Sequence, residues 1–370
     1  MEPQVLPTLR PLRLGELLDR AIRLYRGNFL TFIGIIAVVY VPLMVLQTAA
    51  SALLSSSMLR AFSTPEEIFS NSSYWIGILS TIILSLVQFV LVQGIATGAL
   101  TRAVADNYMG RKTGILDAYR GIGKSWPTLL GALLFILLIF FVLMLWWIII
   151  PCLGWFTGLG MMVFLMAVIN PLVAPVIVLE ASGPWSSPED NLFRRFRNWI
   201  LRFMFSIHRA WSLARRRFWP VLGYVIVLAL FSLIVVNGPV VIINILLSQV
   251  LPVFGDPTTQ LVLTSIIQGL ISLIFVLIYY PLQMAAFTLI YFDLRVRTEG
   301  FDLALLTMEA SGSSALSETM AAPVSQGNER LLTGPELGNF AILTLAGMGL
   351  YIFIFSFIMG SALFFTSLLR

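Results

Sequence analysis

Seven long apolar segments dominate the pattern of the chain. Each approaches or exceeds the roughly 20 apolar residues that a helix needs to cross the hydrocarbon core of a bilayer. They run through residues 29–50, 75–103, 127–150, 156–179, 218–247, 261–292 and 340–368. The period-two alternation typical of membrane strands is absent. The pattern therefore predicts an all-α, polytopic integral membrane protein.

Basic residues fall on one side of these segments. If the N-terminus is cytosolic, all 23 Lys and Arg residues except Arg60 and Arg370 lie in inside segments. The positive-inside rule then predicts seven spans, with the N-terminus cytosolic and the C-terminus outside. The net charge of +5 fits contact with anionic lipid headgroups, and we expect no nucleic-acid partner. Residues 1–9 lack the apolar stretch of a signal peptide, so no cleaved leader is expected.

Three stretches of the chain share one spacing, Ala-x7-aromatic-x4-Gly. Each lies where a basic amphipathic helix enters an apolar segment. The three sets are Ala21, Phe29 and Gly34; Ala118, Trp126 and Gly131; and Ala210, Phe218 and Gly223. This predicts three parallel repeats of an interfacial amphipathic helix plus a transmembrane hairpin, with an extra C-terminal span. The alternative is that any basic interfacial helix followed by a span produces such a match.

The chain divides into four expected parts. A cytosolic amphipathic entry helix occupies 1–28, and a six-span membrane domain occupies 29–305. From about residue 307 the composition changes to Ser, Ala, Gly, Glu and Pro, which cannot bury enough apolar surface to order itself. We therefore expect a flexible cytosolic linker at 306–338 and a seventh transmembrane helix at 339–370.

The entry helices carry candidate lipid contacts. In the first, Leu14, Leu17, Leu18 and Ala21 follow helical spacing, and arginines occupy the other faces. The third has a longer apolar stripe, from Leu192 to Ala214. Such helices are expected to lie in the headgroup plane. The headgroup candidates are Arg20, Arg23, Arg26, Arg194, Arg195, Arg197, Arg202 and Arg209.

Polar residues at membrane depth are costly in lipid and often mark a pathway. They can equally be helix-bridging amides. The candidates are Gln88, Gln93, Asn170, Asn237, Gln268 and Gln283. Pro171, after Asn170, and Pro239, two residues after Asn237, are expected to interrupt the fourth and fifth spans. None of the six is ionisable, which argues against proton- or ion-coupled transport, because such transport usually uses charged residues within the membrane.

The end of the sixth segment carries a charged cluster. Asp293 with Arg297, and Arg295 with Glu299, are i, i+4 pairs, and Gly300 can end the helix in a left-handed conformation. These residues are candidates for a clamp between the cytosolic face and an entry helix. The alternative is a basic anchor that obeys the positive-inside rule.

No catalytic constellation occurs in the sequence. The single cysteine, Cys152, excludes an intramolecular disulfide, and the single histidine, His208, has no expected partner. Metalloprotease, phosphate-loop and nucleophile-elbow motifs are absent. We therefore expect no catalytic residue, no metal and no cofactor.

Several segments resemble bacterial glycerophosphoryl diester phosphodiesterase membrane-domain proteins. Residues 10–26, RPLRLGELLDRAIRLYR, resemble the opening of the family's sequences. Residues 291–302, YFDLRVRTEGFD, resemble the family's closing signature. Residues 174–180 and 209–213 are similar to the family's middle segments. The resemblance implies the membrane region alone, in a bacterial plasma membrane, because the catalytic barrel that gives the family its name is absent.

These observations favour a non-enzymatic membrane scaffold or accessory protein that contacts anionic lipid headgroups. A protein partner or a homo-oligomer would fit that role. The alternative is a transporter or lipid-translocating protein with a polar pathway near the interrupted fourth and fifth spans. A membrane enzyme ranks third, since no catalytic set is found.

Overall fold

Every element in the described part of the chain is helical. The computed structural model describes residues 10–63, 72–123, 125–150, 153–165, 169–180, 191–250, 257–310 and 334–368. Within these ranges, five helices are long and apolar enough to cross a membrane: Phe29–Ser55, Tyr74–Tyr108, Trp126–Ile149, Phe218–Val250 and Thr259–Glu299. This confirms the expected class, a helical membrane protein.

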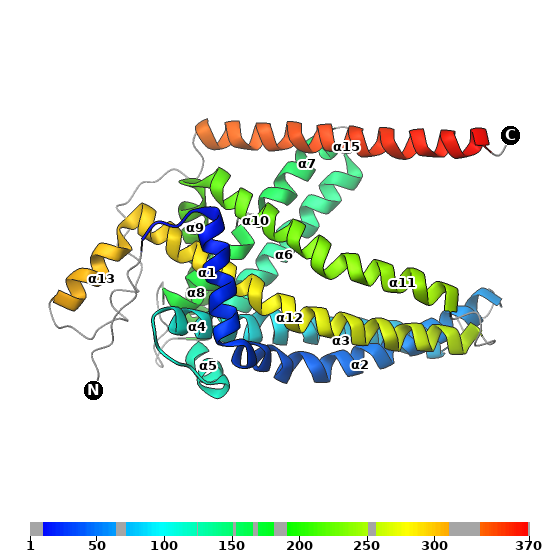
Figure 1. The fold of residues 1–370 in the computed structure, drawn as a ribbon, viewed down its shortest axis with the longest axis horizontal. Helices are drawn as coiled ribbons and strands as arrows, with labels where there is room; N and C mark the ends of the chain where they lie inside the picture. Colours follow the sequence, from blue (N-terminus) through cyan, green and yellow to red (C-terminus); the bar gives the residue numbers. More distant parts are fainter. Residues whose placement is uncertain are drawn as a thin grey trace.

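The elements follow one another in the order shown in Figure 1. They are α1 (Leu14–Gly27), α2 (Phe29–Ser63), α3 (Ser72–Gln88), η2 (Phe89–Ala96), α4 (Thr97–Tyr108), α5 (Ile115–Ile122), α6 (Trp126–Ile149), α7 (Leu153–Phe164), α8 (Asn170–Leu179), α9 (Leu192–Arg215), α10 (Phe218–Ser232), η4 (Leu233–Asn237), α11 (Gly238–Val250), α12 (Pro257–Glu299), α13 (Phe301–Ala310) and α15 (Gly334–Leu368). The two η elements are π-helical turns inside longer helices.

Two of the seven expected spans are not among these five helices. The fourth corresponds to α7 and α8, of 12 and 10 residues, and residues 166–168 between them lie outside the described part of the chain. The seventh lies in α15, where the apolar stretch found in the described residues is Gly338–Phe353. Both ends of the expected linker are helical, because α13 runs to Ala310 and α15 begins at Gly334, and its remaining residues lie outside the described part of the chain.

Most of the arginine-bearing helices, together with α8 and α13, lie at one end of the molecule, which we call the basic end. Figure 1 shows α1, α4, α5, α8, α9 and α13 at the end where α12 finishes, whereas α2, α3, α11 and most of α12 extend away from it. Segments that are far apart in the sequence, and that the positive-inside rule assigns to the same side of the membrane, thus lie at the same end of the molecule.

The fifth span is continuous, which corrects the expected interruption at Asn237. The helix runs from Phe218 to Val250 and passes through a π-helical turn that ends at Asn237. Asn237 Nδ2 donates a hydrogen bond to the Ser232 carbonyl oxygen at 3.3 Å. A π turn widens the backbone locally, so Pro239 is accommodated without ending the helix.

The last helix, α15, packs against α7. A Cβ atom added at Gly160 of α7 would lie 2.6 Å from Thr344 Oγ1, so the glycine allows the close approach. Trp219 Nε1 of α10 also donates to Asn339 Oδ1 at 3.1 Å. Together these contacts hold α15 along one side of the bundle, as Figure 1 shows.

Helix α8 is the centre of the basic end. All residues from 171 to 180 are buried, because the helix is apolar on every face. Residues 285–296 of α12 are likewise all buried, and the two helices lie side by side. Any charged residue on these stretches must find its partners inside the protein.

Candidate functional site

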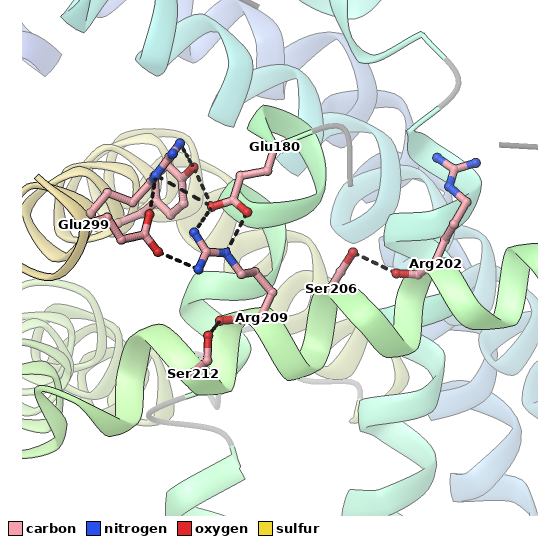
Figure 2. Close-up of polar contacts among 8 residues, drawn as sticks. Glu180, Arg202, Ser206, Arg209, Ser212 and Glu299 are labelled. Atoms are coloured by element: carbon pink, nitrogen blue, oxygen red, sulfur yellow. Dashed lines mark hydrogen bonds and ion pairs between the residues drawn. The ribbon is translucent and has the colours of Figure 1, made fainter. Parts of the chain in front are cut away.

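Glu180 directly follows α8 and has none of its surface exposed. A buried carboxylate without partners costs several kcal/mol, so its contacts decide whether the fold tolerates it. Arg209 of α9 binds it in a bidentate fashion, with Nε 2.9 Å from Oε2 and Nη2 3.2 Å from Oε1. The Tyr291 hydroxyl donates to Oε1 at 3.0 Å. Figure 2 shows Arg209 reaching from its helix toward Glu180.

Two further charges close the arrangement. Glu299 Oε1 lies 2.5 Å from Arg209 Nη1, and Glu299 Oε2 accepts from Arg295 Nε at 3.0 Å. Arg295 Nη1 in turn donates to the Tyr291 hydroxyl at 3.2 Å. We call Glu180, Arg209, Arg295 and Glu299 the four-charge cluster. Its two positive and two negative groups sum to zero and join α8, α9 and α12.

The environment keeps Arg209 charged. Burial by itself lowers the pKa of its guanidinium, but hydrogen bonds and charge from Glu299 and Glu180 outweigh that effect and raise the pKa. Arg209 therefore stays positively charged beside the two carboxylates that it binds.

Gly300 directs the chain back over the cluster. Its φ of +64° is left-handed, which confirms the expected helix ending. The next residue, Phe301, is 2% exposed, and the Arg295 Cζ atom lies 4.4 Å from its ring centroid. This cation–π contact adds to the ion pairs that hold the guanidinium.

The second expected ion pair, Asp293 with Arg297, holds the segment before α1 against α12. Arg297 Nε donates to Asp293 Oδ2 at 2.9 Å, and Arg297 Nη2 donates to the Leu12 carbonyl oxygen at 2.6 Å. The Leu12 amide donates to Asp293 Oδ1 at 2.7 Å. Both i, i+4 pairs expected from the sequence are thus present. Arg295 and Glu299 belong to the four-charge cluster, and Asp293 and Arg297 bind the residues before α1.

Arg209 corrects one expectation about the headgroup candidates. Its side chain is 12% exposed and bound to Glu180 and Glu299, so it does not face lipid. Sequence reasoning also missed Glu180. The available signal was its place directly after a helix with no polar face, since such a carboxylate has to be buried and paired.

The other headgroup candidates divide by exposure. Arg194, Arg195, Arg197, Arg23 and Arg26 are exposed, and Arg202 and Arg20 are partly buried. Arg23 pairs with Asp19 at 2.6 Å, and Arg20 donates to the Tyr108 hydroxyl at 3.4 Å.

The apolar stripe of α9 has two different environments. At its start, Leu192, Phe193 and Phe196 are 85%, 76% and 57% exposed. From Trp199 onward the stripe packs on protein: Trp199 Nε1 donates to the Pro127 carbonyl oxygen at 3.0 Å, and Phe203 is buried. The most exposed apolar side chains of α9 are therefore at its start, although Leu201, Met204 and Phe205 farther along the helix are also 48%, 42% and 40% exposed.

The apolar stripe of α1 is mostly covered by protein, and its expected place in the headgroup plane stays a prediction. Leu17, Ala21 and Tyr25 are 0%, 1% and 6% exposed. Two further apolar residues of α1, Leu14 and Ile22, are each 40% exposed. The hydrogen bonds of Leu12 with Asp293 and Arg297 hold the start of α1 against α12.

Three of the six polar candidates in the apolar segments bridge helices or bind their own helix. Gln93 accepts from the Tyr280 hydroxyl at 3.2 Å, and Gln268 donates to Asn244 Oδ1 at 2.7 Å. Asn237 binds its own helix, as described above. Gln88 and Gln283 are half-buried. Asn170 begins α8, and its side chain lies outside the described residues.

The described part of the chain contains no group of three or more His, Cys, Asp or Glu residues that could hold a metal ion. Cys152 lies outside the described residues. Comparisons with protein-family models, with curated proteins and with solved structures find no match. The resemblance to the phosphodiesterase membrane-domain proteins therefore stays a prediction from the sequence.

Proposed function

We propose that this protein is a non-enzymatic membrane scaffold or accessory protein whose basic end contacts anionic lipid headgroups. In this proposal the basic end faces the cytosol of a bacterial cell and the C-terminus lies outside. The observation that carries it is the first part of α9, where Leu192, Phe193 and Phe196 are exposed among Arg194 and Arg197.

That combination suits a membrane surface. Burying a large apolar side chain contributes about 1.5–3 kcal/mol, so three of them exposed on one helix favour an apolar neighbour. Each arginine near an anionic surface adds about 1 kcal/mol. A helix with both features lies in the interface with its apolar side inserted.

The four-charge cluster supports a scaffold role by fixing α9 to the spans. Arg209 lies on the same helix as Arg194 and is held by both α8 and α12. The exposed part of α9 therefore extends from a rigid attachment at a set angle to the bundle. Since all four charges neutralise one another, the cluster is better suited to holding helices than to proton transfer.

The bridging amides favour this role over transport. A polar pathway requires amides that converge on one hydrated cavity, whereas Gln93 and Gln268 each bind a side chain of another helix. One cavity described between α2 and α12, of about 320 Å³, is lined almost entirely by apolar side chains such as Met44, Leu270 and Leu273.

The test is the double variant Arg194→Gln/Arg197→Gln in full-length protein, with Arg194→Lys/Arg197→Lys as the charge-preserving control. Hydrogen exchange of residues 192–200 is measured in nanodiscs with and without phosphatidylglycerol. We expect anionic lipid to protect this segment in the wild type and the lysine control, and much less in the glutamine variant. If all three proteins are as strongly protected in neutral nanodiscs as the wild type is with phosphatidylglycerol, the segment packs on protein, which contradicts the proposal.

A further inference from the structure

Two of the three matched glycines mark tight contacts between a span and the entry helix of the next repeat. A Cβ atom at Gly34 of α2 would collide with Ile115 of α5, and one at Gly131 of α6 would collide with Trp199 of α9. Each contact is reinforced by a hydrogen bond from the entry helix to a span carbonyl, donated by the Tyr119 hydroxyl to Ile35 and by Trp199 Nε1 to Pro127. These two junctions are closed.

The third junction is open. A Cβ atom at Gly223 of α10 would meet nothing within 4 Å. In place of a packed side chain, a cavity of about 350 Å³ lies between α10, the start of α1 and α12. Its volume is at the lower end of the range for small-ligand sites, about 300–1,000 Å³.

The cavity combines positive charge with an apolar wall. Arg13, Arg217 and Arg297 line it, together with one carboxylate, Asp293. Both oxygens of Asp293 are already bound, one by the Leu12 amide and the other by Arg297. Residues Arg13 and Arg217 are exposed. Three arginines and one aspartate give the lining a net charge of about +2 at neutral pH.

The apolar part of the lining includes Leu14 and Leu294. Arg217 directly precedes α10, a helix long and apolar enough to enter a membrane. The charged side of the cavity therefore lies where a span begins, which is the level of lipid headgroups. A ligand that fits has an anionic head and an adjoining apolar part.

We propose that this cavity binds the phosphate group of an anionic phospholipid, with Arg13 and Arg217 as the guanidinium ligands. Guanidinium groups match the geometry of phosphate oxygens and bind them in a bidentate manner. Because Asp293 is already neutralised, no free carboxylate remains for the cation of a choline headgroup, so the site selects anionic over zwitterionic lipid. The inference rests on the proposed function, since it requires the basic end to lie at the headgroups.

The test counts phosphatidylglycerol molecules that full-length protein retains after detergent purification, by native mass spectrometry, with phosphatidylcholine as the competing lipid. Gly223→Leu places an apolar side chain in the cavity, starting from a Cβ position with no neighbour within 4 Å, and Arg13→Gln/Arg217→Gln removes two of its positive charges. We expect one tightly held phosphatidylglycerol in the wild type, lost in Gly223→Leu and held about fivefold more weakly for each arginine removed. Gly349→Leu is the matched control, because a Cβ at that position in α15 also meets open space.

The two proposals fail separately. Loss of the tight lipid in the cavity variants, with retention in Arg194→Gln/Arg197→Gln, supports the cavity site. Retention of the lipid in both cavity variants overturns it, whatever the α9 variants show. A third arm adds inorganic phosphate: if phosphate displaces the lipid at equal concentration, the site recognises free phosphate and the lipid assignment is wrong. If Gly223→Leu fails to fold, the arginine variant decides the outcome.

Discussion

Leu12 and Asp293 are joined by a 2.7 Å hydrogen bond although 281 residues separate them in the chain. The amide precedes the first helix and the carboxylate lies near the end of the longest one. Arg297 completes the contact by binding both residues. The start of the chain is thereby held against its last core helix.

Asp293→Ala should destabilise the protein by about 1.5–3 kcal/mol, since it leaves the Leu12 amide and Arg297 without their charged acceptor. The measurement is thermal unfolding in detergent, with hydrogen exchange of residues 12–17 as a local readout. Asp302→Ala, a partly exposed carboxylate in the first turn of α13, is the control and should change stability by less than about 0.5 kcal/mol. Equal effects of the two variants would contradict the role given to Asp293.

Arg209→Met should cost about 3–5 kcal/mol, because it leaves the buried Glu180 carboxylate without its bidentate partner. The double variant Glu180→Leu/Arg209→Met restores charge balance, with Arg295 and Glu299 still paired, and should recover much of that loss. Thermal unfolding of the two single variants and the double gives the coupling free energy. Additive losses would show that the cluster does not act as a unit.

Tyr25→Phe should stabilise the protein by about 1 kcal/mol. The Tyr25 hydroxyl is buried and has no hydrogen-bond partner among the described residues, so its removal relieves a desolvation cost. The test is the midpoint of thermal unfolding at neutral pH. A destabilised variant would show that the hydroxyl has a partner.

The same residue affects stability at high pH. Burial raises the pKa of Tyr25 from 10.0 to about 12. A phenol whose folded-state pKa is raised keeps its proton longer in the folded protein, so its contribution is full below pH 10 and is lost as the pH rises toward 12. Tyr25→Phe should therefore lose less stability over that interval than the wild type, as followed by unfolding at stepwise increasing pH. Parallel curves would contradict the assignment.

Thiol labelling tests the topology. With Cys152 replaced, a cysteine introduced at Gln249 should react with an impermeant reagent in intact cells, and one at Thr307 should react only after lysis. Both residues are exposed, and they lie in α11 and α13, toward opposite ends of the molecule in Figure 1. The reverse labelling pattern would invert the proposed orientation.

The sequence predicted helices, ion pairs and the helix ending at Gly300, because these depend on local spacing. It could not tell which side of an apolar stripe meets lipid and which meets protein. Leu17 and Leu192 look alike in a helical pattern, yet one is 0% and the other 85% exposed. Lipid tails are as apolar as a protein core, so periodicity alone cannot separate the two environments.

The same limit applies to charge. Arg194 and Arg209 lie on one helix with similar neighbours in the sequence, but only Arg209 meets two buried carboxylates. Its partners come from other elements, Glu180 after α8 and Glu299 in α12. Such a cluster depends on how helices are arranged in space, and no spacing along the chain records it.

The docking of α15 on α7 sets an order of events during synthesis. Gly160 of α7 allows the close approach of Thr344, and the indole of Trp219 donates to Asn339. Asn339 is synthesised 120 residues after Trp219. Until α15 emerges, the face of α7 at Gly160 is available to lipid or to the insertion machinery. Because α15 follows α7 and α10 in the chain, its contacts with them can form only after both of those helices have been synthesised.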